Sequence, residues 1–177
     1  ILYSNDESIL VACPNSYDET LNIKDSVTEI APYAFTSSRT LKYVNLTDNV
    51  TTLGYRAFSR AKNVIDIKLS NKLTSIEESV FEYCGTLKNV SNWDNITSIE
   101  NYAFFQCGGL TNIVIPDNVT YIGDHAFESC TNIRSVIFNE KLETLDEFAF
   151  AYDLKIATID FSKCNSLETI DKYAFID

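Results

Sequence analysis

Residues 119–133 read VTYIGDHAFESCTNI, and this arrangement of apolar and small residues recurs along the whole chain. Its Ala-Phe pair belongs to a series in which each phenylalanine follows the last by 23 residues, with a final interval of 25. The series is Phe35, Phe58, Phe81, Phe104, Phe127, Phe150 and Phe175. Apolar residues also stand eight and five positions before each of these phenylalanines, as Val119 and Ile122 do before Phe127. A unit of this size cannot bury its apolar side alone, so the period predicts a solenoid whose stacked units share one core.

Each unit is predicted to hold two short strands. Leu110–Ile115 alternates with a period of two and is rich in β-branched residues, which favours a first strand. Val119–Ile122 favours a second strand, and the turn formers of residues 116–118 (PDN) stand between the two. The Ala-Phe segment is too short for a long helix, and we expect it to form a single turn of α or 3₁₀ helix. The fold class predicted from these elements is an α/β repeat solenoid.

The stretch VTYIGDHAFESCTNI (residues 119–133) resembles the BspA-like leucine-rich repeat, also called the Treponema pallidum type. VTTLGYRAF (residues 50–58) and VTEIAPYAF (residues 27–35) repeat the resemblance. LYSNDESILVACP (residues 2–14) is similar to the short hairpin that precedes repeat blocks in that family. The resemblance implies a leucine-rich-repeat right-handed superhelix with short strands and single helical turns. It also implies an N-terminal hairpin or cap-like segment over residues 1–20 and about seven 23-residue repeats over residues 21–177, as one domain of a longer chain.

Composition argues against several classes of partner. The 177 residues include 14 Lys and Arg against 25 Asp and Glu, which gives a net charge of −11, and no basic block or face appears. Such a chain repels nucleic acid and anionic membranes, so neither is an expected partner. The sequence holds no apolar run of about 18 residues, so we expect no direct membrane insertion of this segment.

No catalytic residue, cofactor site or metal site is predicted, and the chain is not expected to be an enzyme. His125 is the only histidine, and we interpret it as a surface or half-buried packing residue because its repeat column tolerates diverse chemistry. The other members of that column are Tyr33, Arg56, Ser79, Tyr102, Phe148 and Tyr173. Nucleophile-elbow, phosphate-loop and metalloprotease motifs are absent from the sequence. The cysteines lack the close pairing that a zinc site needs.

Three of the five cysteines, Cys84, Cys107 and Cys130, share one repeat column, in which two earlier units have the small residues Ser38 and Ala61. A column that accepts cysteine, serine and alanine selects for small size, so we predict buried free thiols there. The Cβ atoms of stacked equivalents are expected about 4.8 Å apart, which is slightly long for a disulfide. The remaining two cysteines, at positions 13 and 164, are expected at opposite ends of the solenoid.

Five N-x-S/T sequons occur, at Asn45, Asn49, Asn89, Asn95 and Asn118. They are glycan acceptors only in a eukaryotic secretory route. Three of them, at positions 49, 95 and 118, occupy one repeat column, where an asparagine of the turn precedes the threonine of the next strand. Repetition of the unit is therefore sufficient to explain these three.

A binding face is predicted on the first strand of each unit, at positions that alternate with the core columns and therefore point away from the core. These positions vary in chemistry from unit to unit while the core does not. The candidate residues are Tyr43, Asn45, Asp66, Lys68, Asn89, Ser91, Trp93, Asn112, Val114, Ser135, Ile137 and Thr158. Trp93 has two interpretations: it fills the space left by Asn92 at an otherwise apolar position, or it is an exposed aromatic anchor.

The function that the resemblance implies is non-enzymatic protein binding through this face, as cell-surface adhesion or recognition of a host matrix. The implied partner is a protein or glycoprotein of a host matrix or another cell, and the implied location is the cell surface or secreted. An intracellular leucine-rich-repeat scaffold for protein assembly remains an alternative, because free thiols fit it equally well. A non-binding spacer is a third interpretation. The matching columns are core positions, so they carry the fold and not the function.

Overall fold

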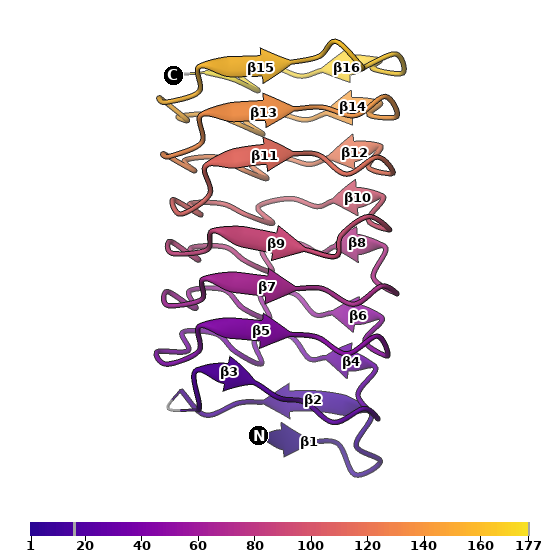
Figure 1. Cartoon of the computed structure of the whole chain (residues 1–177), viewed down its shortest axis with the longest axis vertical. Coiled ribbons are helices and arrows are strands. Elements are labelled where there is room, and N and C mark those ends of the chain that lie inside the picture. The colour runs from indigo at the N-terminus through magenta and orange to yellow at the C-terminus, as the bar shows by residue number, and fades with distance from the viewer. Residues whose placement is uncertain (16, 177) are drawn as a thin grey trace.

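The computed structural model describes residues 1–15 and 17–176, which form an elongated β-solenoid of about seven turns (Figure 1). Its strands are short and lie on two faces. The odd-strand face consists of β3 (Thr20–Leu21), β5 (Tyr43–Asn45), β7 (Asp66–Lys68), β9 (Asn89–Ser91), β11 (Asn112–Val114), β13 (Ser135–Ile137) and β15 (Thr158–Asp160). The even-strand face consists of β2 (Ile9–Ala12), β4 (Glu29–Ile30), β6 (Thr52–Leu53), β8 (Ser75–Ile76), β10 (Ser98–Ile99), β12 (Tyr121–Ile122), β14 (Thr144–Leu145) and β16 (Thr169–Ile170). The first strand, β1 (Leu2–Tyr3), precedes both series.

Neighbouring strands pair in parallel at the spacing of the sequence repeat. On the odd-strand face Ile113 pairs with Val136, 23 residues later, and on the even-strand face Ile99 pairs with Ile122. Each face nevertheless consists of two sheets. The even-strand face is interrupted between β6 and β8, and the odd-strand face between β9 and β11; Figure 1 shows wider spacing at both places.

The predicted apolar columns form the core, except that Ile159 and Ile170 of the last repeat are 39% and 48% exposed. The phenylalanines from Phe35 to Phe150 are 0–1% exposed, and consecutive rings stack. The two ring pairs that include Phe81 differ from the rest: Phe58–Phe81 and Phe81–Phe104 are tilted by 29° and 25°. Phe104–Phe127, by comparison, is tilted by 10° with centroids 5.0 Å apart. The stack is thus tilted around Phe81, and ring contact is kept throughout.

The prediction of an α or 3₁₀ turn at the Ala-Phe segment is wrong, because the described residues contain no helix. The main-chain N–H of Ala57 donates to Gly54 O within its own turn (3.0 Å), but the next N–H, of Phe58, donates to Val80 O of the following repeat (3.0 Å). A helix would need every N–H for its own turn. The fold is therefore a β-solenoid and not an α/β solenoid.

Left-handed backbone conformations also exclude a helix here. The residues two before each phenylalanine of the series, and two after those from Phe35 to Phe150, have positive φ, as Arg56 (55°) and Arg60 (60°) do around Phe58. The full set in these two columns is Tyr33, Ser37, Arg56, Arg60, Ser79, Tyr83, Tyr102, Gln106, His125, Ser129, Phe148, Tyr152 and Tyr173. Each such residue turns the chain so that alternate N–H groups face the next repeat.

Asparagine side chains join repeats on the loops between the two faces. The Nδ2 atoms of Asn49, Asn95 and Asn118 donate to Asp25 O (2.8 Å), Asn71 O (2.7 Å) and Asp94 O (2.8 Å) of the preceding repeat. The amide that would carry a glycan is thus used to join repeats. This contact gives the sequon column a structural role.

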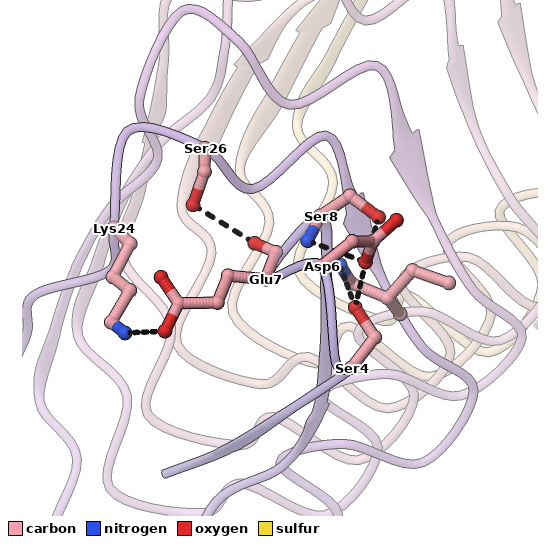
Figure 2. A network of polar contacts seen from close by, with 7 residues as sticks. Ser4, Asp6, Glu7, Ser8, Lys24 and Ser26 are labelled. Carbon is pink, nitrogen blue, oxygen red and sulfur yellow. Dashed lines mark hydrogen bonds and ion pairs between the residues drawn. The ribbon is translucent and has the colours of Figure 1, made fainter.

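The N-terminal strands form a hairpin in which β1 pairs antiparallel with β2, and β2 pairs in parallel with β4. Contacts between side chain and backbone attach the hairpin turn to the next repeat. Lys24 Nζ donates to the Glu7 carboxylate, and Ser26 Oγ donates to Glu7 O at 2.9 Å (Figure 2).

Asp6 organises the same hairpin turn. Its Oδ1 accepts hydrogen bonds from Ser4 Oγ (2.6 Å), Ser8 Oγ (2.8 Å) and Ser8 N (3.1 Å) (Figure 2). These bonds favour the charged carboxylate and lower the pKa of Asp6 from 3.8 to about 2.

Removing a ring from the phenylalanine stack should destabilise the whole solenoid. Phe127→Ala leaves a cavity between Phe104 and Phe150, whose rings lie 5.0 and 4.9 Å from that of Phe127. We expect a loss of ~3–5 kcal/mol in the free energy of unfolding, measured by urea denaturation. Phe127→Leu is the matched control and should cost less than about 1.5 kcal/mol. A loss below about 1 kcal/mol for the alanine variant would show that the ring is not core.

The Asp6 carboxyl should titrate well below an ordinary aspartate. Because its folded pKa is depressed, the bonds to Ser4 and Ser8 stabilise the hairpin above pH 3.8, and this contribution is lost as the pH falls toward about 2. An NMR titration of the Asp6 carboxyl carbon should give a midpoint near pH 2. The double variant Ser4→Ala/Ser8→Ala should move the midpoint toward 3.8, whereas a wild-type midpoint already at 3.8 would contradict the assigned bonds.

Candidate interaction face

The structure brings the predicted binding residues together on the odd-strand face. Within β5, Val44 is buried while Tyr43 and Asn45 on either side are exposed, and β11 repeats this alternation around Ile113. Pairing in register places Tyr43 beside Asp66 and Asn45 beside Lys68. The remaining candidates in strands, Asn89, Ser91, Asn112, Val114, Ser135, Ile137 and Thr158, lie on β9, β11, β13 and β15. Their role in binding stays a prediction.

Hydrogen bonds between strands order several polar side chains on this face. Asn89 Nδ2 donates to the Asp66 carboxylate, and Ser135 Oγ donates to Asn112 Oδ1 at 2.8 Å. Both bonds join equivalent positions in successive repeats. Side chains held in this way lose less conformational freedom on binding, which favours contact with a partner.

Two apolar side chains are exposed at separate places on the face. Tyr43 is 41% exposed on β5, and Val114 is 57% exposed on β11, where it pairs with Ile137 of β13. The interruption between β9 and β11 separates these two places. The face thus has one part on β3 to β9 and another on β11 to β15.

The position of Trp93 agrees better with a side chain that fills the space beside Asn92 than with an exposed aromatic anchor. It is partly buried against the core, and its ring contacts Phe104 edge to face at 6.4 Å and 83°. It also borders a cavity of about 120 Å³ at the interruption between β9 and β11. Sequence reasoning identified the departure at Asn92 and Trp93 but missed this cavity.

His125 is a half-buried packing residue, as predicted. Its ring stacks between those of Tyr102 (4.6 Å) and Phe148 (4.9 Å), and Nδ1 contacts the Glu128 carboxylate. This aromatic row lies in the Ala-Phe turns, which connect the even-numbered strands β4 to β14 to the odd-numbered strands that follow them and which we call the turn edge. Across residues 1–15 and 17–176 we find no group of three or more His, Cys, Asp or Glu side chains arranged to hold a metal ion.

The cysteine column is buried, as predicted, and each of its thiols donates to the carbonyl of an equivalent phenylalanine. Cys84, Cys107 and Cys130 donate from Sγ to the carbonyls of Phe58 (3.2 Å), Phe81 (3.1 Å) and Phe104 (3.1 Å). Burial raises the pKa of Cys84 to about 12 and also raises the pKa values of the other two well above the ordinary value. Thiolate is the reactive form, so these thiols are chemically protected.

The half-buried thiols lie elsewhere in the molecule. Cys13 follows β2, and Cys164 lies in the two-residue insertion between β15 and β16, where its Sγ donates to Asn139 O at 3.1 Å. Partial burial raises both pKa values.

The sequence matches the model of a known repeat family. A family described as the BspA type leucine-rich repeat region, in six copies, matches residues 12–113 and 97–177, and the chain belongs to this family. Comparison with curated proteins found no match. No helix in the described part of the chain has the length and hydrophobicity needed to cross a membrane.

Several solved structures share this fold. The leucine-rich repeat protein of T. pallidum has a TM-score of 0.80 at 23% identity, covering 93% of this chain and 86% of that one. A leucine-rich cell surface protein from Faecalibacterium prausnitzii has a TM-score of 0.71 at 27% identity, covering 96% of this chain and 40% of that one. A leucine-rich repeat protein from Bacteroides ovatus has a TM-score of 0.75 at 26% identity, covering 86% and 41%. This chain therefore spans about two fifths of the second and third proteins.

The rate of thiol modification should distinguish the buried cysteine column from the half-buried Cys13 and Cys164. With Ellman's reagent at pH 8, Cys13 and Cys164 should react slowly, while Cys84, Cys107 and Cys130 should stay unmodified because burial suppresses the thiolate. All five should react after denaturation. Native-state modification of the column, located by mass spectrometry, would contradict this assignment.

Proposed function

We propose that the chain is a non-enzymatic binding module that acts at a cell surface or after secretion. Its odd-strand face would adhere to a protein or glycoprotein of a host matrix or of another cell. The observation that carries this proposal is the alternation on that face: buried residues such as Val44 and Ile113 are nearly constant in type, while the exposed residues beside them vary from repeat to repeat.

A constant scaffold with variable outward residues suits recognition of an extended surface. Parallel strands place equivalent residues about 4.8 Å apart, so side chains of several repeats contact one partner together. Tyr43 is the first anchor that we assign, because tyrosine is enriched at binding hot spots and this ring is 41% exposed next to Asp66. Membership in the BspA-type family and the similarity to a cell surface protein of F. prausnitzii support the proposal.

Substitution of Tyr43 should weaken adhesion without unfolding the chain. We would measure binding of the whole chain to an array of purified matrix proteins and cell-surface glycoproteins by biolayer interferometry. Tyr43→Ala and Val114→Glu should each reduce the affinity for the bound ligand by about tenfold or more, since each removes or charges an exposed apolar contact.

Tyr152→Ala is the matched control. Tyr152 is 44% exposed, as Tyr43 is 41% exposed, but it lies on the turn edge, so binding should be unchanged. Equal losses in all three variants, or no binding to any member of the array, would contradict the proposal. An antibody that stains the source cells only after permeabilisation would instead favour an intracellular scaffold.

A further inference from the structure

Over the residues that the structure describes, the parallel ladder of the odd-strand face has one interruption, between β9 and β11. At the intact junctions, a main-chain N–H just before each strand donates to the preceding repeat, as Ile65 N does to Lys42 O (2.8 Å) and Arg134 N does to Thr111 O (2.7 Å). Between β9 and β11, both fully within the described residues, the equivalent bond from Thr111 is absent, and the two strands belong to separate sheets. Figure 1 shows β9 and β11 farther apart than the other neighbouring strands of this face.

The second bond of each junction is missing at the same place. The residue after each strand normally donates to the following repeat, as Leu69 N does to Ser91 O (3.0 Å) and Ile115 N does to Ile137 O (2.9 Å). Within the described part of the chain, Asn92 N makes no such bond to β11. The gap is therefore bordered by two strand edges whose donors and acceptors face each other unpaired, and such edges are templates for another strand.

The local sequence explains why the ladder stops at this junction. Where other repeats bury Leu69 or Ile115, this repeat has Asn92, with φ of 63° and with Nδ2 bonded to Leu69 O at 2.7 Å. Asparagine tolerates this left-handed conformation better than apolar residues do. The turn at Asn92 directs Trp93 toward the ring of Phe104, where it forms one wall of the gap.

The gap contains a cavity whose lining is partly apolar and partly polar. Its volume is about 120 Å³, and its walls are Val90 and Trp93 on one side and Leu110 and Ile113 on the other. The buried rings of Phe104 and Phe127 also line it, and Lys88, Asn89 and Asn112 supply its polar lining. A cavity of about 150 Å³ accepts a benzene-sized group, so the apolar part of this cavity has room for a single aliphatic or aromatic side chain.

We propose that the gap between β9 and β11 binds an extended peptide segment of a partner protein. The peptide main chain would pair with the open strand edges, and one apolar side chain would enter the cavity between Trp93 and Ile113. Unpaired main-chain groups on both sides select a polypeptide strand over a glycan or lipid, because only a strand supplies donors and acceptors at the matching spacing. This inference rests on the proposed function and assigns the anchoring site within the same face.

A synthetic heptapeptide tests the site directly. The probe is acetyl-Lys-Thr-Val-Leu-Val-Thr-Lys-amide, labelled with a fluorophore and titrated against the whole chain at about 150 mM salt, so that the opposite net charges are screened. Trp93 is the only tryptophan, so its emission reports on the gap itself. We expect saturable binding below about 1 mM with a shift in Trp93 emission. Replacing the central Leu by Asp, or N-methylating the main chain, should weaken binding by about tenfold or more.

A variant that closes the gap gives the second arm of the test. Asn92→Leu/Trp93→Ser reproduces the Leu69-Ser70 pair of the preceding repeat and should restore the ladder, so peptide anisotropy should show no binding. Tyr152→Ala, on the turn edge, should bind the peptide as the wild type does. If the double variant does not fold, as judged by circular dichroism, the Asp-containing and N-methylated peptides still decide the question.

Three outcomes would overturn the proposal: no saturable binding, equal binding of the N-methylated peptide, or unchanged binding by the folded double variant. If the peptide fails while Tyr43→Ala still weakens adhesion to a surface protein, the gap is excluded and the proposed function stands. If the peptide binds but no strand-face variant affects adhesion, the proposed function is excluded and the gap remains a peptide site.

Discussion

Main-chain hydrogen bonding between the Ala-Phe turns of successive repeats is the interaction on which the rest of this solenoid depends. Phe58 N to Val80 O, Phe81 N to Ala103 O and Phe104 N to Ala126 O continue this series through both places where the strands part. Because the turn edge stays bonded, the phenylalanine rings remain in contact even where they tilt by 25–29°. The turn edge is thus the continuous spine of the molecule, and the strand faces are interrupted.

The repeat and its core could be predicted from the sequence because burial acts on single columns. A position that is apolar in every unit has to face inward, and Leu53, Ile76 and Ile122 are fully buried, as the period predicts. The same alternation predicted which side chains would face outward, and Tyr43, Asn45 and Val114 are exposed. Whether these residues bind a ligand is a separate question, since exposure is set by the scaffold and recognition by a partner.

The helical turn was predicted wrongly because local sequence does not specify where an N–H group donates. Ala57 and Phe58 have a sequence compatible with one helical turn, but Phe58 N bonds the next repeat and Arg56 adopts a left-handed conformation. The departure at Asn92 and Trp93 was visible in the sequence, whereas its effect on pairing between β9 and β11 was not. Strand pairing joins residues 23 positions apart and depends on the path of both chains.

The turns are hydrogen-bonded along the whole series, whereas the strand ladders are interrupted, and this difference determines where the solenoid can accept another strand. Inserting a strand between paired β-strands would normally break their hydrogen bonds, but β9 and β11 have none to each other to lose. At this junction the rings of Phe104 and Phe127, which line the cavity, remain stacked with centroids 5.0 Å apart. A peptide entering there would gain main-chain pairing and bury Val90 and Trp93 further without disturbing the core. An opening of this kind costs little on binding because its cost is met when the chain folds, which is the physical meaning of preorganisation.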